Sequence, residues 1–353
     1  MSISPPNADA QLSFLTKIQR LFDEGDFTAT YKFALLISLA DLAVELGADD
    51  GRPLTLSNRR ISRRIIDLYW KQAAPYGTGK AGTQSGVLVQ NAGSAQAAIV
   101  SAITVFRASN SAATAQIASS HPEFSRLLTV VTQTVSAQPL TYLQNFGGGT
   151  DEFIYERSGR GSICLKPGVS FCLRRFQPLV QQLARSHWVD HIKGNRRNHS
   201  ILGQADDLEK FLFATSRQSL RQLGEGLRRL DGTRCFYCRR GMTSADVDHF
   251  VPFSRYPRDV ANNFVLAHAR CNRSKSDMLA AKRHLERWLI RLRQHADDLA
   301  EIAFQAGVVV DEAACRSVAS WGYSSAAASG AQAWVSPNSF EAIDSTYADS
   351  FLA

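Results

Sequence analysis

Two short pairs of cysteine and histidine constrain this chain more than any other feature of its sequence. Cys235 and Cys238 form a Cys-x-x-Cys pair, and His268 and Cys271 form a later His-x-x-Cys pair. Two such pairs, joined by a longer loop, can surround a tetrahedral zinc ion without strain. Because all four ligands would come from protein, this zinc would be structural and would leave no open position for chemistry. The alternative interpretation is a group of unliganded side chains.

Composition narrows the class of protein. Six cysteines in 353 residues are too few and too scattered for a disulfide framework, and grouped cysteines indicate metal binding instead. A hydrophobic fraction of 44% is typical of a globular protein with a buried core. No stretch reaches the ~18 uninterrupted apolar residues of a membrane span, and the first residues lack a secretory signal pattern. We therefore expect a soluble, cytoplasmic protein without a membrane partner.

Charge is distributed unevenly along the chain, whose formal net charge is +8. Residues 228–293 contain 15 Lys or Arg and 6 Asp or Glu, whereas residues 294–353 contain 1 and 8. A basic block followed by an acidic segment indicates a polyanionic partner that is bound at one place. The alternative is a basic surface that contacts only solvent.

Hydrophobic periodicity predicts an α+β protein that is mainly helical. Residues 1–227 are expected to form a mainly helical N-terminal domain for recognition or docking, with a small antiparallel β-meander at about 151–173. Residues 228–293 would form a module around the metal ligands, and residues 294–353 an acidic helical C-terminal extension. Trp334 could stack on nucleic-acid bases, although core packing is the more usual role of such a residue.

Three polar motifs lie between the ligand pairs or at their end. The segment 247–252, VDHFVP, predicts a strand that carries Asp248 and His249 and ends at proline. Because adjacent strand residues face opposite ways, these two side chains share one site only if the chain bends or bulges there. Asn263 precedes a second apolar run, and Asn272 directly follows the last cysteine ligand.

The order and spacing of these motifs, from Cys235 to Lys275, resemble the HNH endonuclease family. The family pattern is CxxC, a DH pair followed by apolar residues and proline, an asparagine before an apolar run, and CxxCN with trailing basic residues. The segment 272–277, NRSKSD, is also similar to the HNH domain of RNA-guided CRISPR nucleases. One departure is His268, which stands where the family often has cysteine. The resemblance implies a ββα-metal nuclease module in the C-terminal half.

The resemblance also implies catalytic roles. His249 would be the general base that deprotonates the attacking water, and Asn263 would hold its imidazole in position. Asp248 and Asn272 would hold one catalytic Mg²⁺ or Mn²⁺, in addition to the structural Zn²⁺.

Four basic residues are expected to contact nucleic acid, namely Arg239, Arg240, Arg273 and Lys275. Arg273 or Lys275 could also add positive charge near the scissile phosphate. For each basic residue, the alternative is ordinary contact with the nucleic-acid backbone or simple solvation.

The function predicted from this resemblance is hydrolysis of phosphodiester bonds in DNA, with RNA not excluded. The alternative is a non-catalytic, zinc-stapled nucleic-acid-binding subunit of a larger complex. The presence of Asp248, His249 and Asn272 favours the enzyme. Similar stand-alone bacterial HNH proteins often serve in restriction, antiviral defence against phage, or mobile elements. A homodimer, or association with another protein of a defence system, is a further expectation.

Overall fold

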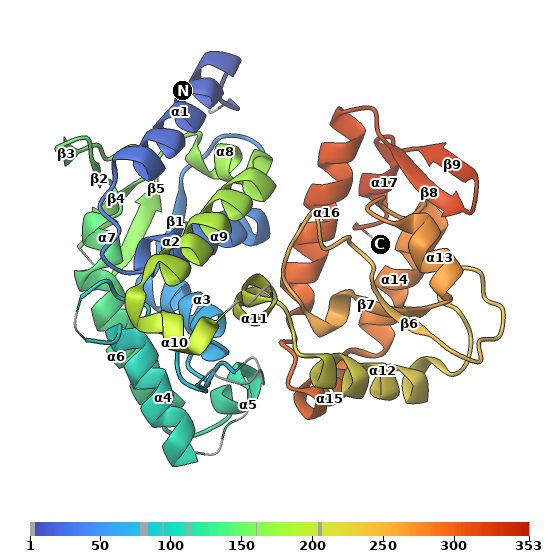
Figure 1. Ribbon diagram of the computed structural model, residues 1–353. Helices are drawn as coiled ribbons and strands as arrows, with labels where there is room; N and C mark the ends of the chain where they lie inside the picture. The colour runs from blue at the N-terminus through green and yellow to red at the C-terminus, as the bar shows by residue number, and fades with distance from the viewer. Residues whose placement is uncertain are drawn as a thin grey trace. The chain divides into compact units, whose positions relative to one another are not determined.

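The chain folds into two compact units, Met1–Ala214 and Thr215–Ala353. The computed structural model describes residues 4–77, 84–93, 95–110, 112, 114–159, 161–203 and 207–352. Helices dominate both units and the sheets are small and antiparallel, which confirms the predicted α+β class (Figure 1). Within the described residues, no helix is both long and apolar enough to cross a bilayer.

The first unit is built around one central helix. Helix α2 (Tyr31–Leu46) is buried continuously from Lys32 to Glu45, because its sequence is apolar on every side. The other helices of this unit are α1 (Ala8–Glu24), α3 (Asn58–Trp70), α4 (Ala98–Asn110), α5 (Ala115–Ser119), α6 (Phe124–Ala137), α7 (Pro139–Tyr142), α8 (Val169–Arg175), α9 (Gln177–Gly194), η1 (Arg196–Asn198), α10 (His199–Leu202) and α11 (Leu208–Phe213). Several of them pack against α2 and enclose a single apolar core.

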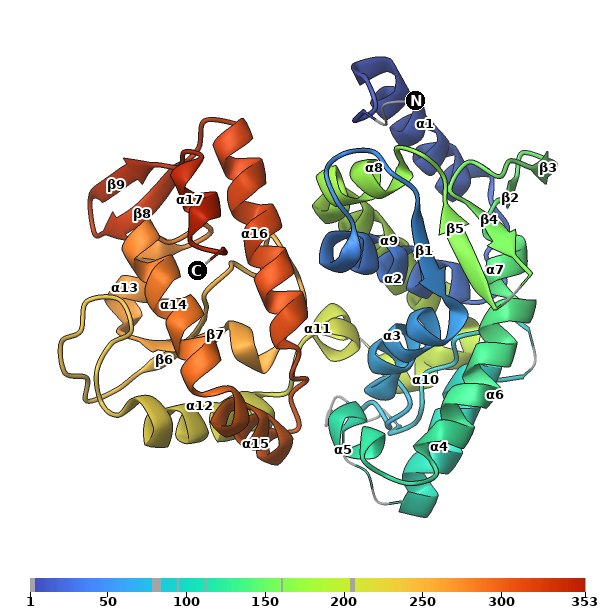
Figure 2. The ribbon, with the colours of Figure 1, turned by 180° about the vertical axis from the view of Figure 1, so that it is seen from behind.

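A three-stranded antiparallel sheet lies in the first unit, in the order β1-β5-β4 (Figure 2). Strands β4 (Tyr155–Ser158) and β5 (Ser162–Leu165) fall inside the predicted meander. Its third strand, however, is β1 (Leu54–Ser57), which pairs with β5 from far earlier in the chain.

The last part of the predicted meander is therefore wrong, because residues 169–175 form helix α8 and not a strand. Gly168 adopts the left-handed conformation, with φ 80°, and starts the helix directly after β5. Val169, Cys172 and Leu173 are then buried at helical spacing. A separate two-stranded hairpin joins β2 (Asn145–Phe146) to β3 (Gly149–Thr150).

The second unit begins earlier than the boundary expected at residue 227, because helix α12 (Arg217–Asp231) belongs to it. Strands β6 (Asp246–His249) and β7 (Phe264–Ala267) pair antiparallel and are followed by helix α13 (Ala269–Lys275), which gives a ββα order. The remaining elements are η2 (Ala261–Asn263), α14 (Lys282–Gln294), α15 (Ala296–Ala306), α16 (Glu312–Ala328), β8 (Gln332–Ser336), β9 (Ser339–Ala342) and α17 (Thr346–Asp349).

The C-terminal extension, which we expected to be helical, also contains the β8–β9 hairpin. Trp334 of β8 is buried, and its indole nitrogen donates a hydrogen bond to the Ser274 hydroxyl at 3.0 Å. Its ring also packs edge-on against Tyr237, with centroids 5.2 Å apart. Trp334 is therefore a core residue that attaches the extension to the ββα segment.

Candidate functional site

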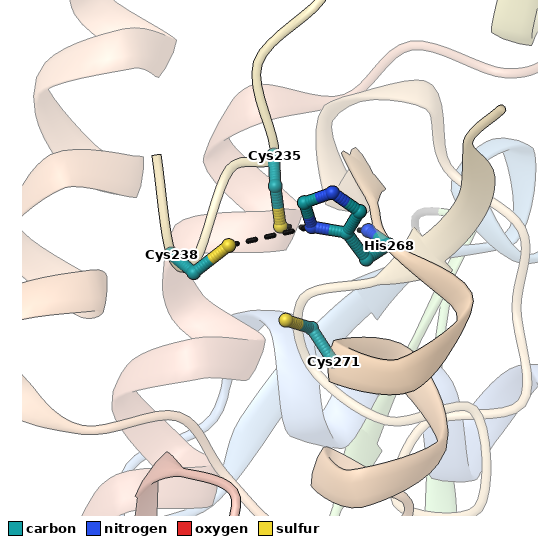
Figure 3. Close-up of side chains that lie close together, drawn as sticks. All are labelled: Cys235, Cys238, His268 and Cys271. Carbon is teal, nitrogen blue, oxygen red and sulfur yellow. Dashed lines mark hydrogen bonds between the residues drawn. The ribbon is translucent and has the colours of Figure 1, made fainter. Parts of the chain in front are cut away.

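The four predicted zinc ligands lie together in the second unit. The ligand atoms of Cys235, Cys238, His268 and Cys271 all lie within 4.8 Å of one another (Figure 3). The two earlier cysteines come from a tight turn, and the later pair comes from the N-terminal end of α13. The cluster therefore joins the chain before β6 to the start of the helix that follows β7.

Hydrogen bonds orient the histidine of this cluster. Nδ1 of His268 lies 3.3 Å from Sγ of Cys238, and Nε2 lies 3.0 Å from the carbonyl oxygen of Gly241. An imidazole that donates Nε2–H to a carbonyl keeps Nδ1 free to bind metal. The side chain is therefore presented in the form that zinc requires.

The electrostatics of the thiols are also compatible with a bound cation. Burial raises the pKa of Cys271 to about 12, and the thiolate charges of its cysteine neighbours add to this effect. Burial also acts to raise the pKa of Cys238, but hydrogen bonds from the Arg240 backbone and from neighbouring ligands lower it to about 7. Because thiolates repel one another here, a divalent cation would stabilise the group strongly. The Cys3His set is compatible with structural zinc.

Strand β6 carries its polar residues on two faces. Its pairing with β7 is regular from Asp246 to His249, so no bulge brings adjacent side chains to one side. Asp246 and Asp248 therefore share one face, and His249 lies on the other.

Helix α13 contacts the acidic face of β6. Nδ2 of Asn272 donates to Oδ2 of Asp246 at 3.1 Å, and Nζ of Lys275 lies 3.3 Å from Oδ2 of Asp248. Asn272 and Lys275 are three residues apart, so both side chains lie on the same side of the helix. Asp248 and Asn272, which we expected to bind one metal together, thus each have another partner in this structure.

Asp248 lies at the centre of a buried polar group. The Tyr237 hydroxyl donates to Oδ2 of Asp248 at 2.6 Å, beside the Lys275 ammonium. Burial raises the pKa of Asp248, and the Lys275 charge opposes that effect. Burial likewise lowers the pKa of Lys275, which Asp248 opposes. The two charges therefore stabilise each other inside the protein.

The burial of Lys275 corrects our expectation that it contacts nucleic acid from the surface. Its side chain is 1% exposed, because the position three residues after Asn272 turns it toward β6 and not toward solvent. Arg239, Arg240 and Arg273 are exposed, as a residue that contacts nucleic acid must be.

His249 is held by a carboxylate that the sequence did not reveal. Its Nε2 lies 2.6 Å from Oδ1 of Asp259, and its ring packs against Phe264 with centroids 4.4 Å apart. Oδ2 of Asp259 accepts a hydrogen bond from the Thr215 backbone at 3.1 Å. Burial would raise the pKa of Asp259, but the hydrogen bonds from His249 and Thr215 lower it below its ordinary value. The imidazole is still 23% exposed and therefore accessible to water.

Asn263 holds the chain after His249, and not the imidazole as we expected. Its Oδ1 accepts from the Val251 backbone nitrogen at 2.8 Å, and its Nδ2 donates to the Val251 carbonyl at 2.9 Å. Its own carbonyl accepts from the Phe250 nitrogen at 2.7 Å. Asn263 therefore fixes the backbone that leads out of β6.

Two acidic residues of the site were missed by sequence reasoning. Asp246 precedes Asp248 by two positions, and strand alternation alone could have identified it. Asp259 is the single acidic residue between His249 and Asn263, which is a weaker signal.

Comparison with known protein families gives one match. Residues 239–281 match a family described as HNH endonuclease. The match includes β6, β7 and α13 together with His268 and Cys271, and it starts directly after Cys238. No curated protein matches the chain. The second unit therefore carries a segment that matches the HNH endonuclease family and includes His268 and Cys271 of the Cys3His cluster, which confirms the resemblance predicted from the sequence.

Proposed function

We propose that this chain, whose second unit carries the HNH endonuclease segment, is a metal-dependent endonuclease that hydrolyses phosphodiester bonds in DNA. One observation supports this most strongly. His249 is a partly exposed imidazole fixed by the carboxylate of Asp259, and it is the last residue of β6. A phosphate at this end of the strand would have to reach both the imidazole and the opposite face, which carries two carboxylates. An imidazole that is oriented in this way can take a proton from water.

His249 would act as the general base. When Nε2–H is donated to Asp259, Nδ1 is the nitrogen that remains to accept a proton from water. Asp259 would orient the ring and stabilise the imidazolium that forms when the proton is taken up. Asn263 would contribute indirectly, because it fixes the backbone that follows His249.

The residues on the acidic face fit a hard cation. Asp246, Asp248 and Asn272 offer carboxylate and amide oxygens, which are the ligands that Mg²⁺ and Mn²⁺ prefer. The Lys275 ammonium opposes the effect of burial on the pKa of Asp248, and a cation bound to this carboxylate would take the place of one of its present partners. When bound, the cation would stabilise negative charge on the phosphate and on the leaving oxygen.

The Cys3His cluster would have a structural role. Its four ligand atoms fit one tetrahedral zinc ion and leave no position for substrate. Zinc at this place would fix the start of α13, and with it Asn272 and Lys275, against the chain that leads into β6. The positions of the catalytic groups would then depend on the zinc.

The exposed arginines and the local excess of basic residues support a polyanionic substrate. Binding should weaken steeply as salt concentration rises, because counterions are released when phosphates are neutralised. Restriction, antiviral defence and mobile-element activity are the roles we propose for such an enzyme. The alternative of a non-catalytic binding subunit does not explain why His249 and Asp259 form an oriented pair.

Cleavage assays test this proposal. Zinc-loaded, full-length protein should convert supercoiled plasmid to nicked or linear DNA in the presence of Mg²⁺ or Mn²⁺, and EDTA should stop the reaction. Parallel assays on single-stranded DNA and on RNA identify the substrate class. If the folded protein binds DNA but cleaves none of these nucleic acids with either cation, the non-catalytic alternative is favoured.

The orienting role of Asp259 has its own test. Asp259→Asn should lower kcat about tenfold or more, up to the 10²–10⁴-fold that a general base usually contributes, and should leave KM nearly unchanged. Its pH–rate profile should also shift relative to that of the wild type. The matched control is Asp297→Asn, an exposed carboxylate in α15 that should have no effect. An Asp259→Asn enzyme with wild-type kcat and pH profile would remove Asp259 from the mechanism.

A further inference from the structure

A second group of basic side chains surrounds a cavity of about 270 Å³ in the second unit. The cavity lies between the end of α12, the turn that contains Cys235 and Cys238, and one side of α14. None of the proposed catalytic residues lines it. Its polar lining includes four arginines, namely Arg234, Arg239, Arg287 and Arg291.

Only one of these arginines is neutralised. Arg291 forms a bidentate ion pair with Asp231, with the closer contact at 2.7 Å. Among the described residues, no carboxylate forms an ion pair with Arg234, Arg239 or Arg287. Three positive charges therefore face one cavity without a protein anion to balance them, which is the arrangement expected of an anion site.

Arg287 is held in place by the zinc-binding turn. Its Nη1 donates to the Phe236 carbonyl at 2.8 Å, and its guanidinium lies 5.7 Å from the centre of the Phe236 ring. Burial lowers the pKa of Arg287, and the neighbouring charges of Arg239 and Arg283 lower it further. Because the contacts with Phe236 already position the Arg287 guanidinium, little side-chain entropy would be lost when a ligand binds.

Arg239 occupies a backbone position that suits glycine. Its φ of 63° lies in the left-handed region, which residues with a Cβ rarely adopt. In this conformation the Arg239 nitrogen donates to the Cys235 carbonyl at 3.0 Å. A guanidinium is therefore present where the backbone alone would favour glycine, and the side chain lines the cavity.

We propose that the cavity lined by Arg234, Arg239 and Arg287 binds a backbone phosphate of the nucleic-acid substrate, away from the scissile phosphate. Guanidinium groups match phosphate oxygens in bidentate geometry, which explains arginine at all three positions. Phe236, Leu266 and Ile290 add apolar wall against which a sugar can pack. This inference rests on the proposed function for the identity of the ligand.

The zinc site would then serve two purposes. The turn from Cys235 to Cys238 fixes the start of the nuclease segment, and it also presents Arg234 and Arg239 on either side of itself. Loss of zinc should therefore weaken nucleic-acid binding as well as catalysis.

The test measures binding and catalysis separately. Binding of a labelled DNA duplex to full-length, zinc-loaded Arg234→Gln, Arg239→Gln and the double variant is followed by fluorescence anisotropy over a range of salt concentrations. Each substitution should reduce the slope of log K against log salt by about one, which is the effect of one lost phosphate contact. In cleavage assays the same variants should raise KM and leave kcat unchanged.

Arg229→Gln is the matched control, because it removes the same charge from a residue that is exposed in α12 and does not line the cavity. If the cavity variants bind DNA with the same affinity and the same salt slope as Arg229→Gln, the inference is overturned, even if the protein cleaves DNA. A protein that cleaves nothing but shows the predicted loss of slope would support the phosphate site and contradict the proposed nuclease.

Discussion

The two units of this chain differ in what holds their elements together. In the first, α2 is buried from Lys32 to Glu45, and helices surround it to form one extensive apolar core. In the second, the segment that matches the HNH endonuclease family contains two strands of 4 residues and a helix of 7 residues. The Cys3His cluster joins the chain before the first strand to the start of the helix. Elements this short bury too little surface to fix side chains accurately on their own. From this difference we infer that the order of the second unit around β6, β7 and α13 would depend on a metal ion bound by the Cys3His cluster, whereas the order of the first unit would not.

Removal of the metal should produce the largest difference in stability between the two units. A structural zinc ion contributes roughly 10–16 kcal/mol of apparent binding free energy in small zinc domains, so Cys235→Ser should unfold the segment around β6, β7 and α13. The first unit should keep its hydrogen-exchange protection, because none of the four ligands belongs to it. Metal analysis and hydrogen exchange, resolved by unit, measure both outcomes.

Cys164→Ser is the control, since Cys164 lies in β5 of the first unit and outside the cluster. If Cys235→Ser kept its protection in residues 246–275, or if well-folded wild-type protein contained no zinc, the distinction between the units would fail.

The next largest effect should appear in the first unit. Arg64 and Glu45 form a buried ion pair with a shortest contact of 2.6 Å and side chains 7% and 4% exposed. Arg64→Met takes the guanidinium away from the buried Glu45 carboxylate, so it should lower the unfolding free energy of this unit by about 3–5 kcal/mol. Zinc content and protection of the second unit should not change.

Urea unfolding followed by probes in each unit measures this effect. The matched control is Arg20→Met, which breaks the exposed pair with Glu24 and should change stability little. Loss of zinc from Arg64→Met would show that the units are not independent in the way we describe.

Acid should destabilise the second unit through His284. Burial between Tyr237 and Trp334 lowers the pKa of His284 to about 4. An unfolded histidine titrates near 6.5, so the unfolded state binds the proton more readily as pH falls between these values. The contribution of neutral His284 to the unfolding free energy is therefore fully present above pH ~6.5, and it should fall by roughly 3 kcal/mol as the pH approaches ~4.

His284→Phe should lose this part of the pH dependence, because it keeps the aromatic contacts without the titrating group. The Val335 carbonyl, which accepts from His284, would retain its hydrogen bond from Arg283 at 2.9 Å. Denaturant unfolding at neutral and acidic pH measures how much unfolding free energy each protein loses in acid. The effect of acid on zinc binding is common to both proteins and cancels when the two losses are subtracted. Parallel pH curves for the two proteins would assign the acid sensitivity elsewhere.

The smallest predicted effect concerns a helix cap in the first unit. The Ser57 hydroxyl accepts from the Arg60 nitrogen at 3.2 Å and caps α3. Ser57→Ala should lower the unfolding free energy by about 1 kcal/mol, whereas Ser57→Asp should preserve the cap. Thermal unfolding measures both, and equal losses in the two variants would mean that the hydrogen bond contributes nothing.

Local spacing predicted the parts of the site that depend only on neighbours in sequence. The clustering of Cys235, Cys238, His268 and Cys271 follows from two short pairs. The catalytic roles of Asp248, His249 and Asn272 come from motifs of a few residues and stay predictions. Helical periodicity likewise predicted the mainly helical class, because apolar spacing repeats over several turns.

Contacts between distant segments could not be predicted in the same way. Asp259 reaches His249 only because the loop after β6 returns to it, and β1 joins β5 from far away in sequence. The burial of Lys275 depends on which side of α13 faces β6. Tertiary packing decided each of these features.

A single-turnover comparison of wild type with His249→Ala tests the central claim most directly. Both proteins are checked first for equal zinc content and equal unfolding curves, and His199→Ala, an exposed histidine in α10, serves as the control. We predict that His249→Ala cleaves plasmid 10²–10⁴-fold more slowly, the usual contribution of a general base, and that the control cleaves at the wild-type rate. Cleavage by His249→Ala at the wild-type rate would contradict the account.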